Sequence, residues 1–262
     1  MASEVKTNKI SPVGSTVTLG DASDVFQLPA SAEIDIAIGA TLDVNGTIDI
    51  TGATTTGFPS SGFHNVNFVT ATDTSVDLTS GTTLIIVEVL GAGGCAGGAD
   101  APGNYGGTGG AGGYSMQQLT VVDSDTWNVT IGAGGTDAGT RNGGDTIFAQ
   151  ASGSSLGSTI TGGGGVGAPN PSGAHTDGGA GGSITNANSG NKLNIAGADG
   201  AAGATTKGGR DSPYGWGGSK TTVAVGAGGN AVGYGSSGGD SLGSNQNGGS
   251  GADGLVVIWE YK

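Results

Sequence analysis

The sequence predicts an all-β protein with essentially no α-helix, in which strands and an oligomeric β-stalk precede a glycine-rich domain of packed extended helices. Three observations support this fold class. Glycine begins seven of the eight triplets in Gly91–Tyr114, isoleucine, leucine and valine take even positions across residues 34–50, and apolar runs at Thr83–Leu90 and Gly254–Lys262 bracket the glycine-rich region. No helical apolar period extends over ten or more residues without glycine.

The triplet period indicates the backbone of the polyglycine region. Polyproline II geometry has three residues per turn and no internal hydrogen bonds, so every third residue faces one side. Glycine on that side lets neighbouring helices approach and hydrogen-bond to one another. The period returns in separate frames through residues 164–182, 197–218, 226–238 and 248–254, as expected if each block is one helix and each break a loop. The alternative is a flexible glycine/serine tract, against which the bracketing apolar strands argue.

The region before residue 83 divides in two. Residues 1–30 hold strand candidates at Ser15–Leu19 and Val25–Leu28 and form the first predicted unit. Residues 31–82 form the predicted stalk and connector, because a single apolar face over residues 31–60 is best covered by further copies wound together as a trimer. A monomeric hairpin packed on the glycine-rich part is the alternative. Residues 83–262 form the third predicted unit, the glycine-rich domain.

Shorter strands are predicted within and after the connector. Phe63–Leu78 suggests short strands, and Leu119–Val122 and Trp127–Ile131 lie between the two bracketing apolar runs. The bracketing runs are nearly continuous in apolar residues, which is typical of buried strands.

Composition excludes several classes of function. The 262 residues carry a net charge of −13, with only 8 lysines and arginines, which disfavours binding to nucleic acid or anionic membranes. A single cysteine, Cys95, excludes an intrachain disulfide framework. The polar start predicts no signal peptide, and no apolar run approaches the roughly 20 residues of a membrane span. We therefore expect synthesis in a reducing cytoplasm, without membrane insertion.

The motifs that suggest chemistry lack the context it needs. The GxGxxA pattern in Val87–Ala96 and the similar Val223–Ala231 would need a following helix to bind a dinucleotide, and both run into more glycine. Asn142–Ala149 and Gly238–Gly243 resemble calcium-binding repeats only faintly and are interpreted as strand starts after a glycine turn. His64 and His175 are far apart, and Cys95 is expected to be a packed residue. We expect no catalytic residues, no metal, no cofactor and no enzyme activity.

The order of these blocks resembles the glycine-rich domain that closes many bacteriophage tail fibres. The resemblance rests on TLIIVEVLGAGG, GGTGGAGGYS, TWNVTIGAGG, GGDTIFA, the later glycine blocks and GADGLVVIWEY, while EVKTNKISP…TVTLGDASDVFQLP is similar to the start of phage fibre proteins. It implies a virion protein, made in the host cytoplasm, that attaches to the tail or baseplate by its N-terminal part. It further implies recognition of a host surface polysaccharide or outer-membrane protein.

The resemblance also implies that loops between glycine blocks contact the receptor. The main candidates lie in RDSPYGW, where tyrosine and tryptophan offer rigid contact surface; capping of the helix bundle by Tyr214 and Trp216 is the alternative. Two other functions remain open: a purely structural fibre or connector, and a glycine-rich ice-binding type of protein. The candidate receptor-binding residues are Arg210, Asp211, Tyr214, Trp216, Tyr105, Asn170, His175 and Tyr234.

Overall fold

The computed structural model of the chain is all-β, which confirms the predicted fold class. It describes residues 62–262 except 123, 154, 158, 171–175, 204–207, 220–225 and 244. The predicted attachment region at residues 1–30, the stalk at 31–60 and the candidate His175 lie outside the described residues. Within the described ranges there is no helix, and so none long and apolar enough to span a membrane.

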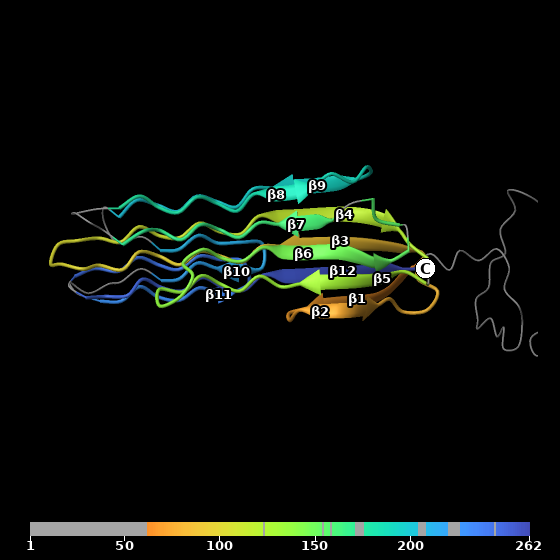
Figure 1. Cartoon of the computed structure of the whole chain (residues 1–262), viewed down its shortest axis with the longest axis horizontal. Helices are drawn as coiled ribbons and strands as arrows, with labels where there is room; N and C mark the ends of the chain where they lie inside the picture. The colour runs from red at the N-terminus through yellow and green to blue at the C-terminus, as the bar shows by residue number, and fades with distance from the viewer. Residues whose placement is uncertain are drawn as a thin grey trace, which may run out of the picture. The chain divides into compact units, whose positions relative to one another are not determined.

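Two antiparallel sheets of five strands form one end of this unit (Figure 1). The first sheet has the order β1-β12-β3-β4-β9 and the second β2-β5-β6-β7-β8, while β10 and β11 pair separately. The first sheet comprises β1 (Phe63–Val69), β12 (Leu255–Tyr261), β3 (Leu84–Leu90), β4 (Tyr114–Thr120) and β9 (Lys192–Ile195). The second comprises β2 (Asp73–Asp77), β5 (Thr126–Thr130), β6 (Thr146–Ser152), β7 (Ile160–Gly162) and β8 (Ile184–Asn186).

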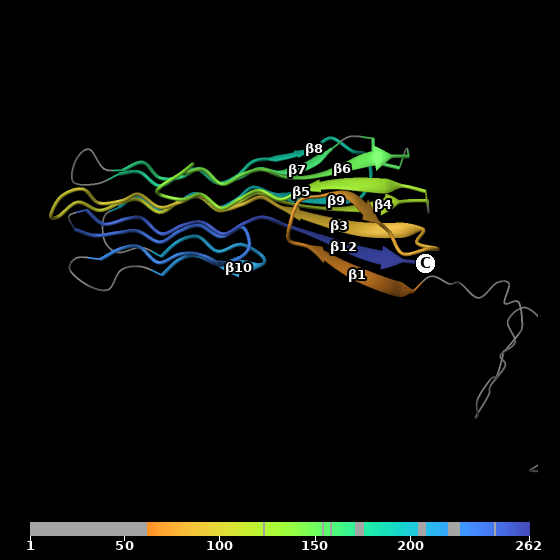
Figure 2. The ribbon, with the colours of Figure 1, turned by 60° about the horizontal axis from the view of Figure 1, so that its bottom comes forward.

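The hydrophobic core lies between the two sheets, which Figure 2 shows as two layers. Trp127 and Phe148 of the second sheet are fully buried there and stack with ring centroids 4.7 Å apart. The first sheet contributes the side chains of Ile85, Val87 and Val89, which alternate with residues that point to its outer face. Burial of these side chains stabilises the sandwich by about 1.5–3 kcal/mol each.

The strands at Thr83–Leu90, Trp127–Ile131 and Gly254–Lys262 are confirmed within one or two residues. The prediction of a strand at Leu119–Val122 was wrong in its limits, because β4 begins at Tyr114. Its buried side chains include Ser115 and Gln117, which hydrogen-bond to Asn194 Oδ1 and the Ser189 carbonyl. Polar residues on the inner face hid the alternation that would have marked this strand.

Three pairs of neighbouring strands, β3–β4, β5–β6 and β7–β8, continue directly into pairs of glycine-rich segments (Figures 1 and 2). Residues 91–99 follow β3 and residues 106–113 return to β4. Residues 132–136 and 140–145 extend β5 and β6 in the same way. Between the sheets, side chains hold the layers about 10 Å apart. Where glycine replaces them, the backbones approach closely enough for hydrogen bonds in several directions.

The amides of residues 91–99 show how this region is held together. Every third amide donates to the same neighbouring segment, and successive amides donate to different ones. This is the pattern expected of the predicted polyglycine II helices, although the helix type itself stays a prediction. Gly91, Gly94 and Gly97 donate to Gly113, Gly110 and Gly107; Ala92 and Cys95 to Gly144 and Arg141; and Gly93, Ala96 and Ala99 to Ala252, Gly249 and Gln246, over 2.7–3.1 Å.

The sequence predicted that each glycine block is one helix. The block Gly91–Tyr114 is instead two segments joined by a turn. It turns back on itself through residues 100–105, where Gly103 has φ +78°. The triplet register survives because glycines of one arm lie against the backbone of the other: a Cβ on Gly106 would lie 1.9 Å from the Gly97 oxygen, and one on Gly109 2.2 Å from the Gly94 oxygen. Glycines that share one triplet frame can therefore belong to two segments that face each other.

Candidate functional site

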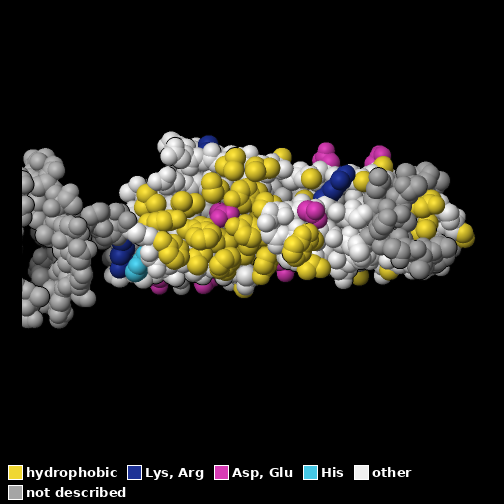
Figure 3. Space-filling view, turned by 180° about the vertical axis from the view of Figure 1, so that it is seen from behind, with side chains coloured by type: hydrophobic (Ala, Val, Ile, Leu, Met, Phe, Trp, Pro, Cys, Tyr) yellow, Lys and Arg dark blue, Asp and Glu magenta, His cyan; other side chains and the backbone are white. Residues whose placement is uncertain are grey.

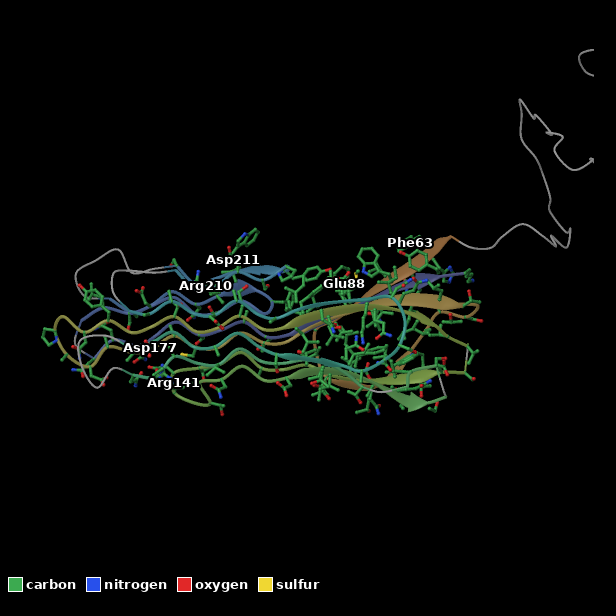
Figure 4. All side chains as sticks on the ribbon, turned by 90° about the horizontal axis from the view of Figure 1, so that it is seen from above. Phe63, Glu88, Arg141, Asp177, Arg210 and Asp211 are labelled. Atoms are coloured by element: carbon green, nitrogen blue, oxygen red, sulfur yellow. The ribbon has the colours of Figure 1, made fainter. Side chains whose placement is uncertain are left out.

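The structure separates the predicted receptor-binding residues into two groups. Arg210, Asp211, Tyr214, Trp216 and Tyr234 gather around the short pair of β10 (Gly215–Trp216) and β11 (Val232–Gly233), beside the end of the first sheet. Figure 4 shows Arg210 and Asp211 on the side of the unit that carries Glu88 and Phe63. The other described candidates, Tyr105 and Asn170, belong to segments at the end away from the strands.

The pair β10–β11 presents an exposed apolar ridge. Trp216 lies opposite Val232, and their side chains are 73% and 62% exposed. The turn before β10 is held by the Asp211 carboxylate, which accepts a hydrogen bond from the Gly217 amide over 2.8 Å. Arg210 donates through Nε to the Asp199 carbonyl over 2.7 Å. These two hydrogen bonds to backbone groups hold the loop in place, while the Trp216 indole remains available for contact with a partner.

Tyr214 has a different role from Trp216. Its hydroxyl donates to Glu88 Oε2 over 2.6 Å, and its ring packs against the cluster of Leu90, Tyr114, Leu255 and Val257. This favours the packing role that the sequence left open for Tyr214, and leaves Trp216 as the exposed aromatic side chain of the loop.

Glu88 is the centre of this cluster, although sequence reasoning did not single it out. The carboxylate is 8% exposed, and it accepts hydrogen bonds from Tyr114 Oη over 2.7 Å and from Trp259 Nε1 over 2.7 Å, besides that from Tyr214. The feature of the sequence that could have indicated its role is its position, since it is an acidic residue within the apolar run of β3. Three donors from β4, β12 and the β10 loop converge on it, which ties the loop to the sheet.

The tyrosine hydroxyls of this cluster have an altered acidity. Burial disfavours the phenolate, and the hydrogen bond to Glu88 adds to this, so the pKa of Tyr114 and of Tyr214 is raised well above the ordinary 10.0. A phenolate there would also face the Glu88 carboxylate. The hydroxyls are therefore held as donors.

Raising the pH above about 10 is expected to destabilise the protein through these two groups. The unfolded chain releases the phenolic protons near pH 10, whereas the folded chain keeps them, so the contribution is complete below pH 10 and falls as the pH rises. The midpoint of urea unfolding, measured at pH 9 and pH 11, checks this. The double variant Tyr114→Phe, Tyr214→Phe should show a smaller fall; an equal fall in both proteins would exclude the two hydroxyls as its cause.

A groove of about 280 Å³ lies next to the β10 loop. Its walls combine the Asp211–Pro213 turn with Tyr114 of β4 and with residues 195–198, which continue β9. A mostly apolar lining that includes the Asp211 carboxylate can hold a flat, hydroxyl-bearing group, as small-molecule sites commonly do.

At the end away from the strands, the two predicted residues Asn170 and Tyr105 make contacts within the domain itself. Asn170 Oδ1 accepts a hydrogen bond from the Gly98 amide over 2.8 Å, and Tyr105 forms an isolated bridge with Leu242. Tyr105 remains half-buried. We infer that Asn170 positions the loops, whereas Tyr105 can still contact a ligand.

Sequence reasoning also missed a repeated use of short acidic side chains along the glycine segments. Asp145, Asp199 and Asp253 each follow GG or GA, and their carboxylates accept hydrogen bonds from amides of neighbouring segments. The predicted strand start within Asn142–Ala149 is confirmed, because β6 begins at Thr146, directly after Asp145. The acceptors and donors are Asp145 with Gly164 (2.9 Å), Asp199 with Gly181 (2.8 Å) and Asp253 with Gly134 (2.7 Å).

The comparison with known families supports the glycine-rich assignment. The sequence profile of a family described as a glycine-rich domain matches residues 69–261. The chain belongs to this family. The match covers the glycine-rich segments and every strand of the two sheets except β1, of which it includes only Val69, so the sandwich and the segments are parts of one family domain. A search of curated proteins finds no match to the chain.

Among the described residues, no three His, Cys, Asp or Glu side chains gather as a group that could hold a metal ion. The GxGxxA pattern after β3 continues as the extended segment 91–99 rather than as the helix that a dinucleotide site requires.

Proposed function

We propose that the chain is a bacteriophage tail fibre protein without enzymatic activity, which attaches to the virion by its N-terminal part and recognises a receptor on the host surface through loops of its glycine-rich domain. The resemblance to fibre proteins and the glycine-rich family domain support this. A structural fibre or connector without receptor binding is the second candidate, which the exposed aromatic side chains of Phe63 and Phe68 on β1 favour.

The observation that carries the proposal is the placement of the loops relative to the first and last described residues of the domain. Gly62 and Lys262 are joined by a hydrogen bond from the Lys262 amide to the Gly62 carbonyl over 3.2 Å, at the strand end. The turns between glycine-rich segments, such as residues 100–105, lie at the opposite end (Figure 1). A domain anchored at one end that presents loops at the other is suited to reach a surface away from its attachment point.

Rigidity of the segments supports the same function. Their backbones are cross-linked by hydrogen bonds that each contribute roughly 1 kcal/mol net, so the loops and the β10 ridge are held in place before binding. Preorganisation of this kind lowers the entropy lost on binding. Asp211, Trp216 and Tyr105 are the side chains that we propose contact the receptor, with the groove beside Asp211 admitting a sugar or a side chain.

Replacing Trp216 by alanine is expected to weaken binding of the labelled full-length protein to bacteria that it coats by about 30-fold, the effect of losing one aromatic anchor of about 2 kcal/mol. Flow cytometry over a concentration series on a panel of bacterial strains measures this. Val122→Ala is the matched control, since Val122 is also apolar and 56% exposed but lies at the strand end.

The outcomes separate the candidate functions. Loss of binding in strains that lack surface polysaccharide would assign a glycan receptor, whereas loss in strains that lack an outer-membrane protein would assign a protein receptor. If Trp216→Ala and Tyr105→Ala both bind as well as the unaltered protein, these side chains are not in the site. Failure to coat any strain that the phage infects would favour the structural candidate.

A further inference from the structure

The groove beside the β10 loop is walled largely by backbone. Five of its ten lining residues are glycine or alanine, namely Ala111, Gly112, Ala196, Gly197 and Ala198. Seen from the side that carries Asp211 in Figure 4, hydrophobic side chains cover the strand part, while backbone and polar side chains make up most of the described surface beyond it (Figure 3). Because so little side-chain volume lines the groove, the backbone of another chain can approach its walls closely.

Two amides in the groove wall have no hydrogen-bond partner among the described residues. They belong to Ala196 and Ala198, which are both exposed. The carbonyls of Gly112 and Ala196 likewise accept no hydrogen bond within the described part of the chain. The wall therefore offers both donors and acceptors of the backbone, which is the property that makes an open sheet edge a template for a further strand.

A segment with neighbours on all sides shows what this edge lacks. Every amide of residues 163–168 donates to a neighbouring segment, over 2.7–2.9 Å. In residues 195–203, every third amide donates to residues 176–182, and residues 106–113 donate to this segment from a second side. A backbone with three residues per turn has a third side, and on residues 196 and 198 that side has the unpaired amides.

The charge in the groove favours a cationic occupant. Asp211 lines the groove, and one of its carboxylate oxygens accepts the hydrogen bond from Gly217, whereas the other has no partner among the described residues. The neighbouring cation, Arg210, donates to the Asp199 carbonyl. The net charge of −13 also attracts positive rather than negative partners. A lysine side chain of a partner can therefore pair with Asp211.

We propose that this groove binds an extended, lysine-bearing segment of a partner protein that is rich in glycine or alanine. The backbone of the segment lies along residues 195–198 and pairs with the free amides of Ala196 and Ala198, while a lysine reaches Asp211. The edge thereby gains the neighbour that it lacks, as a sheet edge does in strand addition. One turn of such a segment has three residues and is about 9 Å long.

The lining favours a peptide over a sugar. Sites for small ligands commonly use aromatic side chains, and the one aromatic ring among the lining residues, that of Tyr114, is only 8% exposed. The groove thus offers backbone groups and a carboxylate rather than an open ring face. As a statement about the receptor, this inference rests on the proposed function, and it narrows the ligand of the groove to a peptide.

The test is isothermal titration calorimetry of the purified full-length protein in about 150 mM salt, which screens long-range attraction. The probe is a peptide of four Gly-Ala-Lys triplets. A peptide of four Gly-Ala-Glu triplets has the opposite charge, and maltohexaose represents a neutral glycan. We expect the lysine peptide to bind with a Kd on the order of 0.1 mM, because few hydrogen bonds must offset the ordering of a flexible peptide. The glutamate peptide should bind about tenfold more weakly or not at all.

Two variants, each with a matched control, locate the binding. Ala196→Leu places a larger side chain in the groove lining, whereas Ala202→Leu makes the same change at an exposed position of the same segment outside the lining. Asp211→Asn removes the charge and keeps an acceptor for the Gly217 amide, and Asp100→Asn removes a charge at another exposed position. We expect affinity for the lysine peptide to fall about tenfold in Ala196→Leu, about fivefold in Asp211→Asn, and less than about twofold in both controls.

Unchanged binding of the lysine peptide to Ala196→Leu would overturn the proposal, and so would binding of maltohexaose without binding of the peptide. If Ala196→Leu fails to fold by circular dichroism, Asp211→Asn decides, and undiminished binding by that variant would overturn it. Coating of bacteria is measured separately. A protein that coats bacteria but does not bind the peptide refutes this inference alone, whereas one that binds the peptide but coats no strain that the phage infects refutes receptor recognition alone.

Discussion

Replacing Gly112 by alanine is expected to lower the free energy of unfolding by about 4 kcal/mol or more, which is a large part of the stability of a typical domain. The added Cβ would lie 1.9 Å from the Gly91 oxygen and 2.4 Å from its carbonyl carbon. Both are backbone atoms, so the contact cannot be relieved by turning a side chain. Thermal and urea unfolding, followed by circular dichroism, measure the effect.

The size of this effect follows from the hydrogen bonds on both sides of the contact. The Gly112 amide donates to the Gly235 carbonyl over 2.8 Å, and the Gly91 amide donates to Gly113 over 2.9 Å. Moving either backbone by the ångström or more that a methyl group requires would break such bonds in two directions at once. Overpacking in ordinary cores costs about 1–3 kcal/mol because side chains there can adjust.

Gly208→Ala is the matched control within the same glycine-rich region. A Cβ at Gly208 would meet its nearest atom, the Gly218 oxygen, at 3.4 Å, which is ordinary contact. We expect its free energy of unfolding to stay within about 0.5 kcal/mol of that of the unaltered protein. Equal losses in both variants would mean that glycine acts here through its backbone freedom; equal stability in both would refute the close packing of residues 91 and 112.

Replacing Glu88 by alanine is expected to destabilise the protein by about 3 kcal/mol or more. The change removes the acceptor shared by Tyr114, Tyr214 and Trp259, and each buried donor left unpaired costs about 1–3 kcal/mol, less where water can reach it. The truncated side chain also leaves a cavity. Urea unfolding monitored by tryptophan fluorescence measures the loss.

Two further variants give this prediction its controls. Glu88→Gln keeps the volume and one acceptor oxygen, so we expect about half the loss. Asp100→Ala removes the same charge from an exposed position and should change stability by less than about 0.5 kcal/mol. If Glu88→Ala and Asp100→Ala were equally stable, the three hydrogen bonds would contribute nothing net to stability.

Most of the candidate site could be found from the sequence, but the roles of its residues could not. The 210–216 loop was singled out because the resemblance to phage fibres implies that loops between glycine blocks contact the receptor, and because this loop carries large side chains. Tyr214 and Trp216 are two residues apart and equally aromatic, yet one is bonded to Glu88 and the other is 73% exposed. Which of them faces the sheet depends on how the loop is turned against β3, a segment more than 120 residues away in the chain.

The strands likewise divide into those that the sequence predicts and those that only the structure reveals. Those at 84–90 and 255–261 were predicted because their side chains are nearly all apolar, which follows from burial on both faces. The strands β8 and β9 were missed, since their few apolar residues lie among asparagine and threonine and their hydrogen bonds come from partners far away in the sequence. Short edge strands of this kind are defined by pairing more than by composition.

The sequence by itself determined that the protein is all-β, that its second half is built on close backbone approach, and where apolar strands end and glycine begins. These are local properties, because a missing side chain or a two-residue alternation acts wherever it occurs. Only the tertiary structure decided that a single glycine frame joins two facing segments, that Glu88 ties the loop to the sheet, and that Trp216 rather than Tyr214 is exposed. Those facts depend on which segments lie side by side, and glycine, having no side chain, carries little information about its neighbours.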